Sequence, residues 1–387
     1  MKKKVLSLLM AATLAVSMLA GCGSNGGGTE STVSSKEEGS NGASAGAADY
    51  SKLKIGVIIN TSRTDGGWNE AQINGLEAAM DKLGLSEDQY EYIEGVSETG
   101  SDTQNAVEAL VADGCNFILA TSTGHKTDME ALAQKYPNLL FAEADGNTVG
   151  DNLIGYAIHG VEGMFLMGYL CAKLSPTNEL GYVAGMPESS VIEAIDGFAL
   201  GAKYANEKAT VRALFANSWY DPEVEGECAN SLISLGISYI GIGCSSPAAA
   251  QACGDAGVFC TGYNLDTSSY APSAVLSSFM WNWEPIFEEI LVSYAENDYV
   301  PNAVDYFYGA AEGCIDIAPF AEDLVPEDVQ NEVLAVQKQI ESGEIQVLAG
   351  EIKDNEGNVI VEEGAVMDEE SSRKFDYFVD NVIGQLP

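Results

Sequence analysis

The polar loop at residues 65–69 (DGGWN) carries side chains suited to holding a small ligand. Asp65 supplies a carboxylate, Trp68 a flat apolar face, and Asn69 both a hydrogen-bond donor and an acceptor. Gly66 and Gly67 would let the backbone come close to a ligand. An ordinary turn, with Trp68 folded onto the core and Asn69 capping a helix, accounts for the same residues without a ligand.

This loop lies between a predicted strand and a predicted helix. Residues 55–59 (IGVII) form a short apolar run, which is typical of a parallel strand buried on both faces. Apolar residues at 73, 76, 80 and 83 then recur at helical spacing, and Gly84 follows where a left-handed residue ends many helices. In open α/β sheets ligands bind outside the carboxyl ends of strands, so we expect a ligand site at residues 65–69.

The aromatic residues favour binding over catalysis. All four tryptophans, at 68, 219, 281 and 283, fall at or just beyond predicted strand ends, although Trp283 opens a helix and is expected in the core. The one Gly-x-Ser-x-Gly, at 42–46, lies in the Gly/Ser-rich stretch near the N-terminus and not after a predicted strand, so it is no nucleophile elbow. The sequence contains no His-Glu-x-x-His and no glycine-rich phosphate loop. His125 is interpreted as a hydrogen-bonding or exposed residue, but the 58 acidic residues leave a catalytic carboxylate pair open.

The N-terminus predicts an exported, membrane-tethered protein. Residues 2–4 (KKK) precede an apolar stretch at 5–20, the pattern of a signal peptide, which we assign to residues 1–21. The sequence LAGC at 19–22 resembles the lipobox of bacterial lipoproteins, which implies a lipid on Cys22. Residues 22–49 then form a Gly/Ser-rich tether with few apolar side chains. We therefore expect the extracytoplasmic face of a cell membrane as the location.

Charge and cysteine count exclude several classes of protein. The formal net charge of −40 disfavours nucleic acid and anionic lipid headgroups as partners. Of the eight cysteines, seven remain after Cys22, and most lie in apolar runs, where a free thiol behaves as a small hydrophobe. With only two histidines, a zinc site has little material, so no metal is expected.

The alternation of apolar runs and helical patterns predicts an α/β protein with two doubly wound parallel-sheet lobes and a cleft between them. We assign residues 52–176 and about 266–303 to the N-terminal lobe, with the strand at 274–281 returning to it. Residues 177–265 and about 304–387 make the C-terminal lobe. A charged stretch at 351–363 predicts a small hairpin.

Several motifs together resemble the basic membrane protein family, the substrate-binding lipoproteins of ABC importers that bind purine nucleosides or nucleobases. Besides DGGWN, they are NSWYDP at 217–222, Gly262-Tyr263 with Asp266, and WNW at 281–283. The resemblance implies a type I periplasmic-binding-protein-like fold, a purine ligand, and a permease and an ATPase as partners. It also implies a monomer without a cofactor and without enzymatic activity.

The resemblance also implies a set of ligand-binding residues. Trp68 would stack on the base, Asn69 would hydrogen-bond its edge, and Asp266 would be the polar anchor that holds ribose in nucleoside binders. The complete candidate set is Asp65, Trp68, Asn69, Ser122, Thr123, Trp219, Asp221, Asn264, Asp266 and Trp281.

The sequence departs from the family pattern in two places. Nucleoside-binding members carry a lysine where this chain has Trp281, so we expect a free base to bind at least as well as its nucleoside. The loop after the third strand reads TSTGH at 121–125 with Asp128 displaced by one residue, so the ligand-facing residue there stays open. A lipoprotein sensor for a similar ligand and an exported nucleoside-processing enzyme are the alternatives to an importer receptor.

Overall fold

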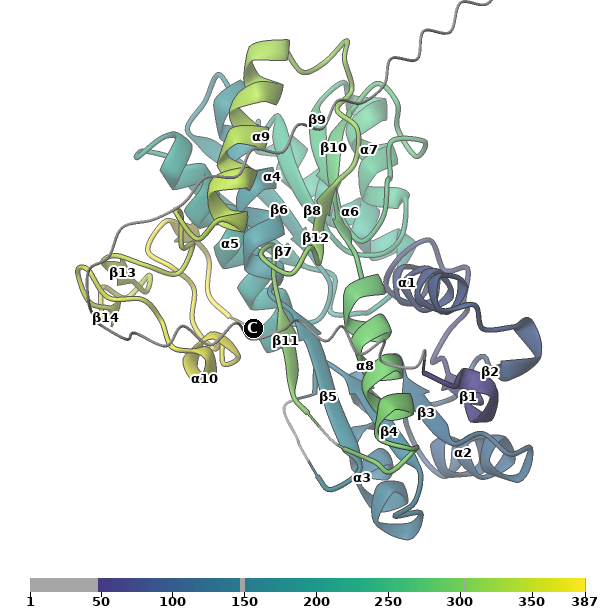
Figure 1. The fold of residues 1–387 in the computed structure, drawn as a ribbon. Helices are drawn as coiled ribbons and strands as arrows, with labels where there is room; N and C mark the ends of the chain where they lie inside the picture. The colour runs from purple at the N-terminus through teal and green to yellow at the C-terminus, as the bar shows by residue number, and fades with distance from the viewer. Residues whose placement is uncertain (1–47, 147–149, 303, 387) are drawn as a thin grey trace, which may run out of the picture. The chain divides into compact units, whose positions relative to one another are not determined.

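The computed structural model describes residues 48–146, 150–302 and 304–386, which form two α/β lobes built on parallel-dominated sheets (Figure 1). The predicted signal peptide, Cys22 and nearly all of the 22–49 tether lie outside the described residues. Among the residues that are described, no helix is both long enough and apolar enough to span a membrane.

The first sheet holds six parallel strands in the order β11-β5-β4-β3-β1-β2. The apolar run at 55–59 forms β1, and β1, β3, β4 and β5 are buried along their whole length because helices cover both faces of the sheet. The strands are β1 (Ile55–Ile58), β2 (Tyr90–Ile93), β3 (Phe117–Ala120), β4 (Leu140–Ala144), β5 (Leu153–Ile158) and β11 (Tyr306–Tyr308).

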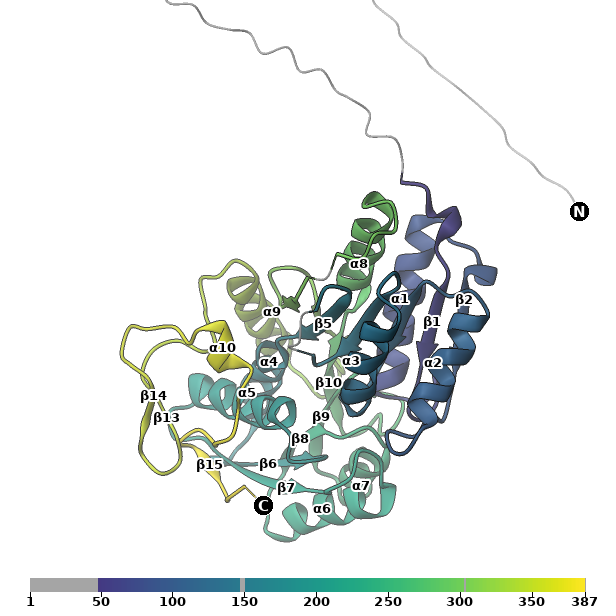
Figure 2. The ribbon, with the colours of Figure 1, turned by 90° about the horizontal axis from the view of Figure 1, so that it is seen from below.

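Two helix layers enclose this sheet (Figure 2). On one face α1 (Trp68–Leu83) packs against α8 (Glu284–Glu296), and on the other α2 (Asp102–Ala112) packs against α3 (Lys126–Lys135). The predicted helix end is confirmed for α1, whose C-cap Gly84 has a φ of 72°, whereas the helix already begins at Trp68, inside the predicted loop.

The second sheet holds seven strands in the order β12-β10-β9-β8-β6-β7-β15, all parallel to their neighbours except β12, which is antiparallel to β10. The strands are β6 (Glu179–Ala184), β7 (Thr210–Phe215), β8 (Tyr239–Gly243), β9 (Phe259–Gly262), β10 (Val275–Trp281), β12 (Ile315–Ile317) and β15 (Val382–Ile383). One face carries α4 (Gly160–Leu174), α5 (Ser189–Ala205) and α9 (Glu327–Glu341), and the other carries α6 (Pro222–Ser234) and α7 (Ala248–Ala256).

Helix α4 corrects the predicted lobe boundary at residue 176. It packs on α5 and on strands of the second sheet, so the chain already crosses between lobes near His159. Glycines bring the two helices together, since a Cβ on Gly168 or Gly201 would lie 1.9 Å from a backbone oxygen of the facing helix. Because α4 is apolar almost all round, its pattern does not indicate which sheet it covers.

Two strands also exchange lobes relative to the prediction. The strand at 274–281, expected in the first lobe, is β10 and pairs with β9 of the second sheet. Conversely β11, from the part assigned to the second lobe, pairs with β5 of the first. A parallel strand buried on both faces has the same apolar pattern in either sheet, so the pattern alone cannot choose the partner. Helix α8 returns to the first lobe as predicted.

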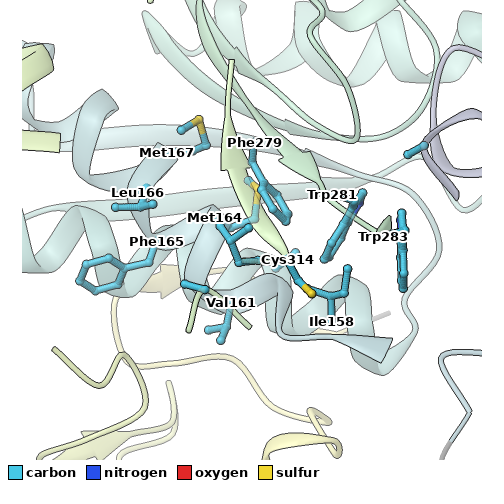
Figure 3. Close-up of a cluster of buried hydrophobic side chains, with 14 of the residues drawn as sticks. Ile158, Val161, Met164, Phe165, Leu166, Met167, Phe279, Trp281, Trp283 and Cys314 are labelled. Carbon is cyan, nitrogen blue, oxygen red and sulfur yellow. The ribbon is translucent and has the colours of Figure 1, made fainter. Parts of the chain in front are cut away.

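A cluster of buried side chains fills the region where the chain crosses between the lobes (Figure 3). Met164 of α4 lies near Phe279 and Trp281 of β10, and Trp283 follows beside them. Gly160 makes room for this cluster, because a Cβ there would lie 2.7 Å from the Trp281 ring. Trp283 is fully buried, which confirms its predicted place in the core.

The C-terminal segment begins after α9 and lies beside α5 (yellow in Figures 1 and 2). The predicted hairpin is confirmed as β13 (Ile352–Lys353) paired antiparallel with β14 (Val359–Val361). A short helix, α10 (Glu369–Ser372), precedes the edge strand β15. The seven cysteines of the described chain are free thiols, and six of them are buried, as expected for structural cysteines.

Candidate functional site

A cavity lies between the carboxyl ends of the strands of the two sheets, where the sequence predicted the site. Seven of the ten candidate residues line it, and loops from both lobes contribute to the wall. The first lobe supplies Asn60, Thr61, Asp65, Trp68, Asn69, Ser122, Thr123 and Asp145; the second supplies Gly185, Ser190, Val191, Trp219, Tyr220, Gly243, Cys244, Ser245, Tyr263 and Asn264.

Asp65 organises the loop that begins α1. Its Oδ1 accepts hydrogen bonds from the backbone N–H groups of Gly67 at 2.9 Å and Glu70 at 3.1 Å, and its Oδ2 accepts from that of Asn69 at 3.2 Å. These donors are among the unpaired N–H groups of the helix N-terminus, which a carboxylate satisfies. The Asp65 carboxylate is therefore engaged within the protein and fixes the position of the neighbouring Trp68.

The amide of Asn69 is likewise used within the loop. Its Nδ2 donates to Asp65 Oδ2 at 2.8 Å, Thr61 Oγ1 at 2.8 Å and Asn60 Oδ1 at 3.1 Å, while its Oδ1 accepts from Thr121 Oγ1 at 2.6 Å. Only 3% of the residue is exposed. This geometry favours a role in positioning Asn60, Thr61 and Asp65 over the direct hydrogen bond to a ligand that the sequence suggested.

Trp68 is held from behind and lines the cavity with part of its surface. Its indole N–H donates to the Thr121 carbonyl at 2.7 Å, and its ring meets those of Trp281 and Trp283 edge to face, with centroids 5.8 and 5.4 Å apart. The ring is half-buried. A fixed aromatic surface beside a cavity is suited to stacking on a flat ligand.

The two glycines of the loop serve a contact between the lobes. A Cβ on Gly67 would lie 2.8 Å from Ser245 Cβ, and one on Gly66, whose φ is 72°, would lie 2.6 Å from the Tyr270 hydroxyl. That hydroxyl donates to the Gly66 carbonyl at 3.2 Å. The groups that come close to the backbone at these glycines therefore belong to the second lobe, whereas the sequence suggested a ligand there.

The second lobe brings aromatic and hydroxyl groups to the opposite wall. Trp219 and Tyr220 are 42% and 50% exposed, so their rings are available to a ligand. Tyr263 and Asn264 follow β9, and Asn264 has a φ of 74°, a conformation that Asn tolerates better than most residues. Its Oδ1 accepts the indole N–H of Trp281 at 2.8 Å.

Asp145 is a lining residue that the sequence argument missed. It follows β4 with a φ of 50°, and burial raises its pKa to about 6, while Ser190 and the Arg373 charge act in the opposite direction. A second cavity adjoins the first and shares Thr123, Asp145, Ser190 and Trp219 with it. The carboxyl of Asp145 thus stands at the junction of the two cavities.

Three candidate residues lie outside the cavity lining. Asp221 caps α6 by accepting the Val224 N–H at 3.2 Å, and exposed Asp266 accepts the Ser268 N–H at 2.9 Å. Trp281 is 9% exposed and packs against Gly160 and Phe279. The reason for expecting a free base to be preferred, bulk from Trp281 at the sugar end of the cleft, therefore loses its support.

The structure shows which residue of the loop at 121–125, after β3, faces the cavity. Ser122 is buried and donates to Glu98, whereas Thr123 is exposed and lines both cavities. His125 is buried with its Nδ1 at 2.7 Å from Thr103 Oγ1, and burial lowers its pKa. The predicted hydrogen-bonded histidine is confirmed, and His125 does not line the cavity.

Most of the missed lining residues share one signal. Asn60, Asp145, Gly185 and Ser245 each stand one or two residues beyond the end of a strand. Applying the carboxyl-end rule to all strands would have found them. Ser190 and Val191 lie in the first turn of α5, for which the sequence carried no separate signal.

The lining is equipped for binding. Cys244 is its one thiol among the described residues, and burial raises its pKa, which keeps it protonated and a poor nucleophile. In the described parts of the chain, no three His, Cys, Asp or Glu side chains gather so as to hold a metal ion. Fixed aromatic rings, hydroxyls and a carboxyl can orient a small neutral ligand.

Known proteins share the sequence pattern and the fold. A family model described as ABC transporter substrate-binding protein, PnrA-like, matches residues 52–351. A purine-binding protein of Brucella abortus is 29% identical over 76% of this chain and 82% of its own. TsgA13 of Haloferax volcanii, whose name provisionally assigns it glucose binding in an ABC transporter, is 30% identical over 71% of this chain and 69% of its own.

Solved structures agree on the architecture. An ABC transporter solute-binding protein from Conexibacter woesei superposes with a TM-score of 0.62 at 18% identity, over 76% of this chain and 98% of that one. At this identity the likeness concerns the fold, which is that of type I periplasmic binding proteins.

Proposed function

The chain belongs to the family of PnrA-like ABC transporter substrate-binding proteins, and from this we propose that it binds a purine base or nucleoside in the cavity between its lobes. The family implies a small-molecule ligand, a permease and an ATPase as partners, and a place outside the cytoplasm. Family and fold are those of solute-binding proteins and not of enzymes.

The lining of the cavity carries the proposal. A purine is flat and neutral and has donors and acceptors on its edges, so it needs aromatic faces and a few fixed polar groups. Trp68 on one wall and Trp219 on the other supply the faces, and Asp145 with Ser190 supplies the polar groups. The purine-binding relative from Brucella abortus supports the same ligand class.

A sugar is the second candidate. The Haloferax relative is named for glucose, and carboxyl, hydroxyl and aromatic groups also suit a pyranose ring. The second cavity, which continues from the first past Asp145, contains Ser189, Ser190 and Glu193, whose oxygens could accept sugar hydroxyls. A nucleoside combines both features.

The first prediction concerns the ligand class. We expect purines or their ribosides, and not D-glucose or amino acids, to raise the melting temperature of residues 48–387. A ligand at about a hundredfold excess over its Kd stabilises the folded state by roughly 2.7 kcal/mol, which gives a clear shift. Calorimetry of adenine, guanine, hypoxanthine and xanthine against their ribosides then ranks base and nucleoside. A shift with glucose alone would contradict the proposal.

The second prediction concerns the membrane anchor. The motif at 19–22 supports lipidation of Cys22, so in its native host Cys22→Ser should leave the precursor uncut or release the protein from the membrane. Cell fractionation and the mass of the N-terminal peptide measure this. Ser24→Ala, two residues away, is the matched control and should stay processed and membrane-bound. Processed, membrane-bound Cys22→Ser would show that the anchor lies elsewhere.

A further inference from the structure

Residues 369–383, here called the strap, lie beyond the residues that the family model matches and are fixed to the second lobe. Strand β15 extends the second sheet by pairing with β7. Asn381 donates to the carbonyls of Ala199 at 2.8 Å and Ala209 at 3.2 Å, and the Val379 N–H donates to Asp196 at 3.0 Å. Phe375, Phe378 and Val382 bury their side chains in the core.

One side chain of the strap reaches across to the first lobe. The Nη2 of Arg373 lies 2.8 Å from Asp305 Oδ2, and its guanidinium carbon stands 3.8 Å from the ring centre of Phe307. Its Nη1 also donates to the Gly146 carbonyl at 3.4 Å. Phe307 is part of β11, Asp305 immediately precedes that strand, and Gly146 follows β4, so all three partners belong to the first lobe.

The environment shields the arginine of this contact more than in an ordinary surface ion pair, while the side chain of Asp305 is 30% exposed. The side chain of Arg373 is only 11% exposed, whereas that of its neighbour Lys374, which pairs with Glu370 of the strap itself, is 60% exposed. A shielded guanidinium that stacks on a ring and pairs with a carboxylate is screened little by solvent. Glu369 of the strap, at 3.0 Å, adds a second carboxylate.

The strap also lines one end of the cleft. Ser372 and Arg373 line the second cavity together with Ile158 and Phe307 of the first lobe. At another edge of the cleft, the Tyr270 hydroxyl binds the Gly66 carbonyl. These contacts, together with the one between Asp145 and Ser190, join the two lobes beside the cavities.

We propose that the strap is a latch, in which Arg373 ties the C-terminal segment to the first lobe, limits opening of the cleft and slows ligand escape. A strap that only covered the second sheet would not need to bury a charge against β11. Opening the lobes separates Arg373 from Asp305 and Phe307, so the ion pair and the ring contact are lost. Only the statement about ligand escape depends on the proposed function.

The third prediction tests the latch without any ligand. Asp102 and Glu223 are each replaced by an unnatural amino acid whose ketone carries a spin label, and the two labels report the distance between the lobes. Both positions are exposed and follow strands that end at the cleft. Wild-type protein and the Lys374→Ala control should give the same narrow distance distribution. Arg373→Ala should give a broader distribution with longer distances. A folded Arg373→Ala protein with the wild-type distribution would overturn the proposal.

Two further measurements keep the test decisive. Asp305→Asn removes the partner charge from the first lobe without altering the strap, so it should reproduce the broadening even if Arg373→Ala fails to fold. With guanosine as the probe, dissociation from Arg373→Ala should be roughly 5- to 10-fold faster than from wild type, and unchanged in Lys374→Ala. If guanosine does not bind the wild type, guanosine is excluded as the ligand, while the distance measurement still judges the latch.

Discussion

Replacing Trp68 by Ala is expected to weaken purine binding by about 5- to 150-fold, the equivalent of about 1–3 kcal/mol for one base stacked on an aromatic ring. The ring lines the cavity, and contacts to Trp281, Trp283 and the Thr121 carbonyl already fix its orientation. The ligand therefore binds to a ring that is already ordered. Removing the Trp68 ring should for this reason lower the affinity for the purine.

Folding should suffer less from this change. The Thr121 carbonyl keeps a donor, because Gln72 Nε2 also binds it at 2.9 Å. The space left by the indole opens into the ligand cavity, so water can fill it. Trp68→Phe is the matched control, since it keeps an aromatic face and loses the N–H together with part of the ring area. Calorimetry and urea unfolding of all three proteins separate the effects. Unchanged affinity in a destabilised Trp68→Ala protein would assign Trp68 to the core.

The fold could be predicted in its elements and only in part in its connections. Each strand and helix is a local pattern, and β1 with α1 follows from residues 55–84 alone. The places where the chain crosses between lobes depend on contacts between distant residues. Helix α4 illustrates this: its choice of sheet rests on glycine contacts with α5, and both partners must be seen together.

The candidate site shows the same division. The loop at 65–69 was found because residue type and position after a strand agree. The position of Trp281 could not be predicted from the sequence. An aromatic residue at a strand end can point either into the cleft or into the buried cluster where the chain crosses between the lobes, and only the space at Gly160 decides this. The contact of Arg373 with the first lobe could not be predicted from the sequence for a third reason. It lies more than 60 residues along the chain from Phe307, and no local pattern connects the two.

The largest expected effect on the free energy of unfolding comes from Trp283, in the buried cluster where the chain crosses between the lobes. Trp283→Ala should lower the free energy of unfolding by about 3–5 kcal/mol, the usual cost of truncating a buried large aromatic. Trp283 is fully buried, and its ring lies against Tyr156 and Phe287 at centroid distances of 5.6 and 6.3 Å. A Cβ on Gly75 of α1 would lie 2.5 Å from the Cβ of Trp283, so the chain at Trp283 packs directly against the backbone of α1.

The matched control uses a property of the indole itself. Among the described residues, the Trp283 N–H has no hydrogen-bond partner, so Trp283→Phe removes an unsatisfied buried donor while it keeps most of the ring contacts. We expect its loss of stability to be clearly smaller than that of Trp283→Ala. Urea unfolding at equal slope measures both. Purine affinity of the folded fraction should fall less than in Trp68→Ala, because Trp283 does not line the cavity and acts on it only through its contact with Trp68. Equal losses for the Phe and Ala variants would contradict this expectation, because they would mean that the ring contacts kept by Phe add nothing to stability.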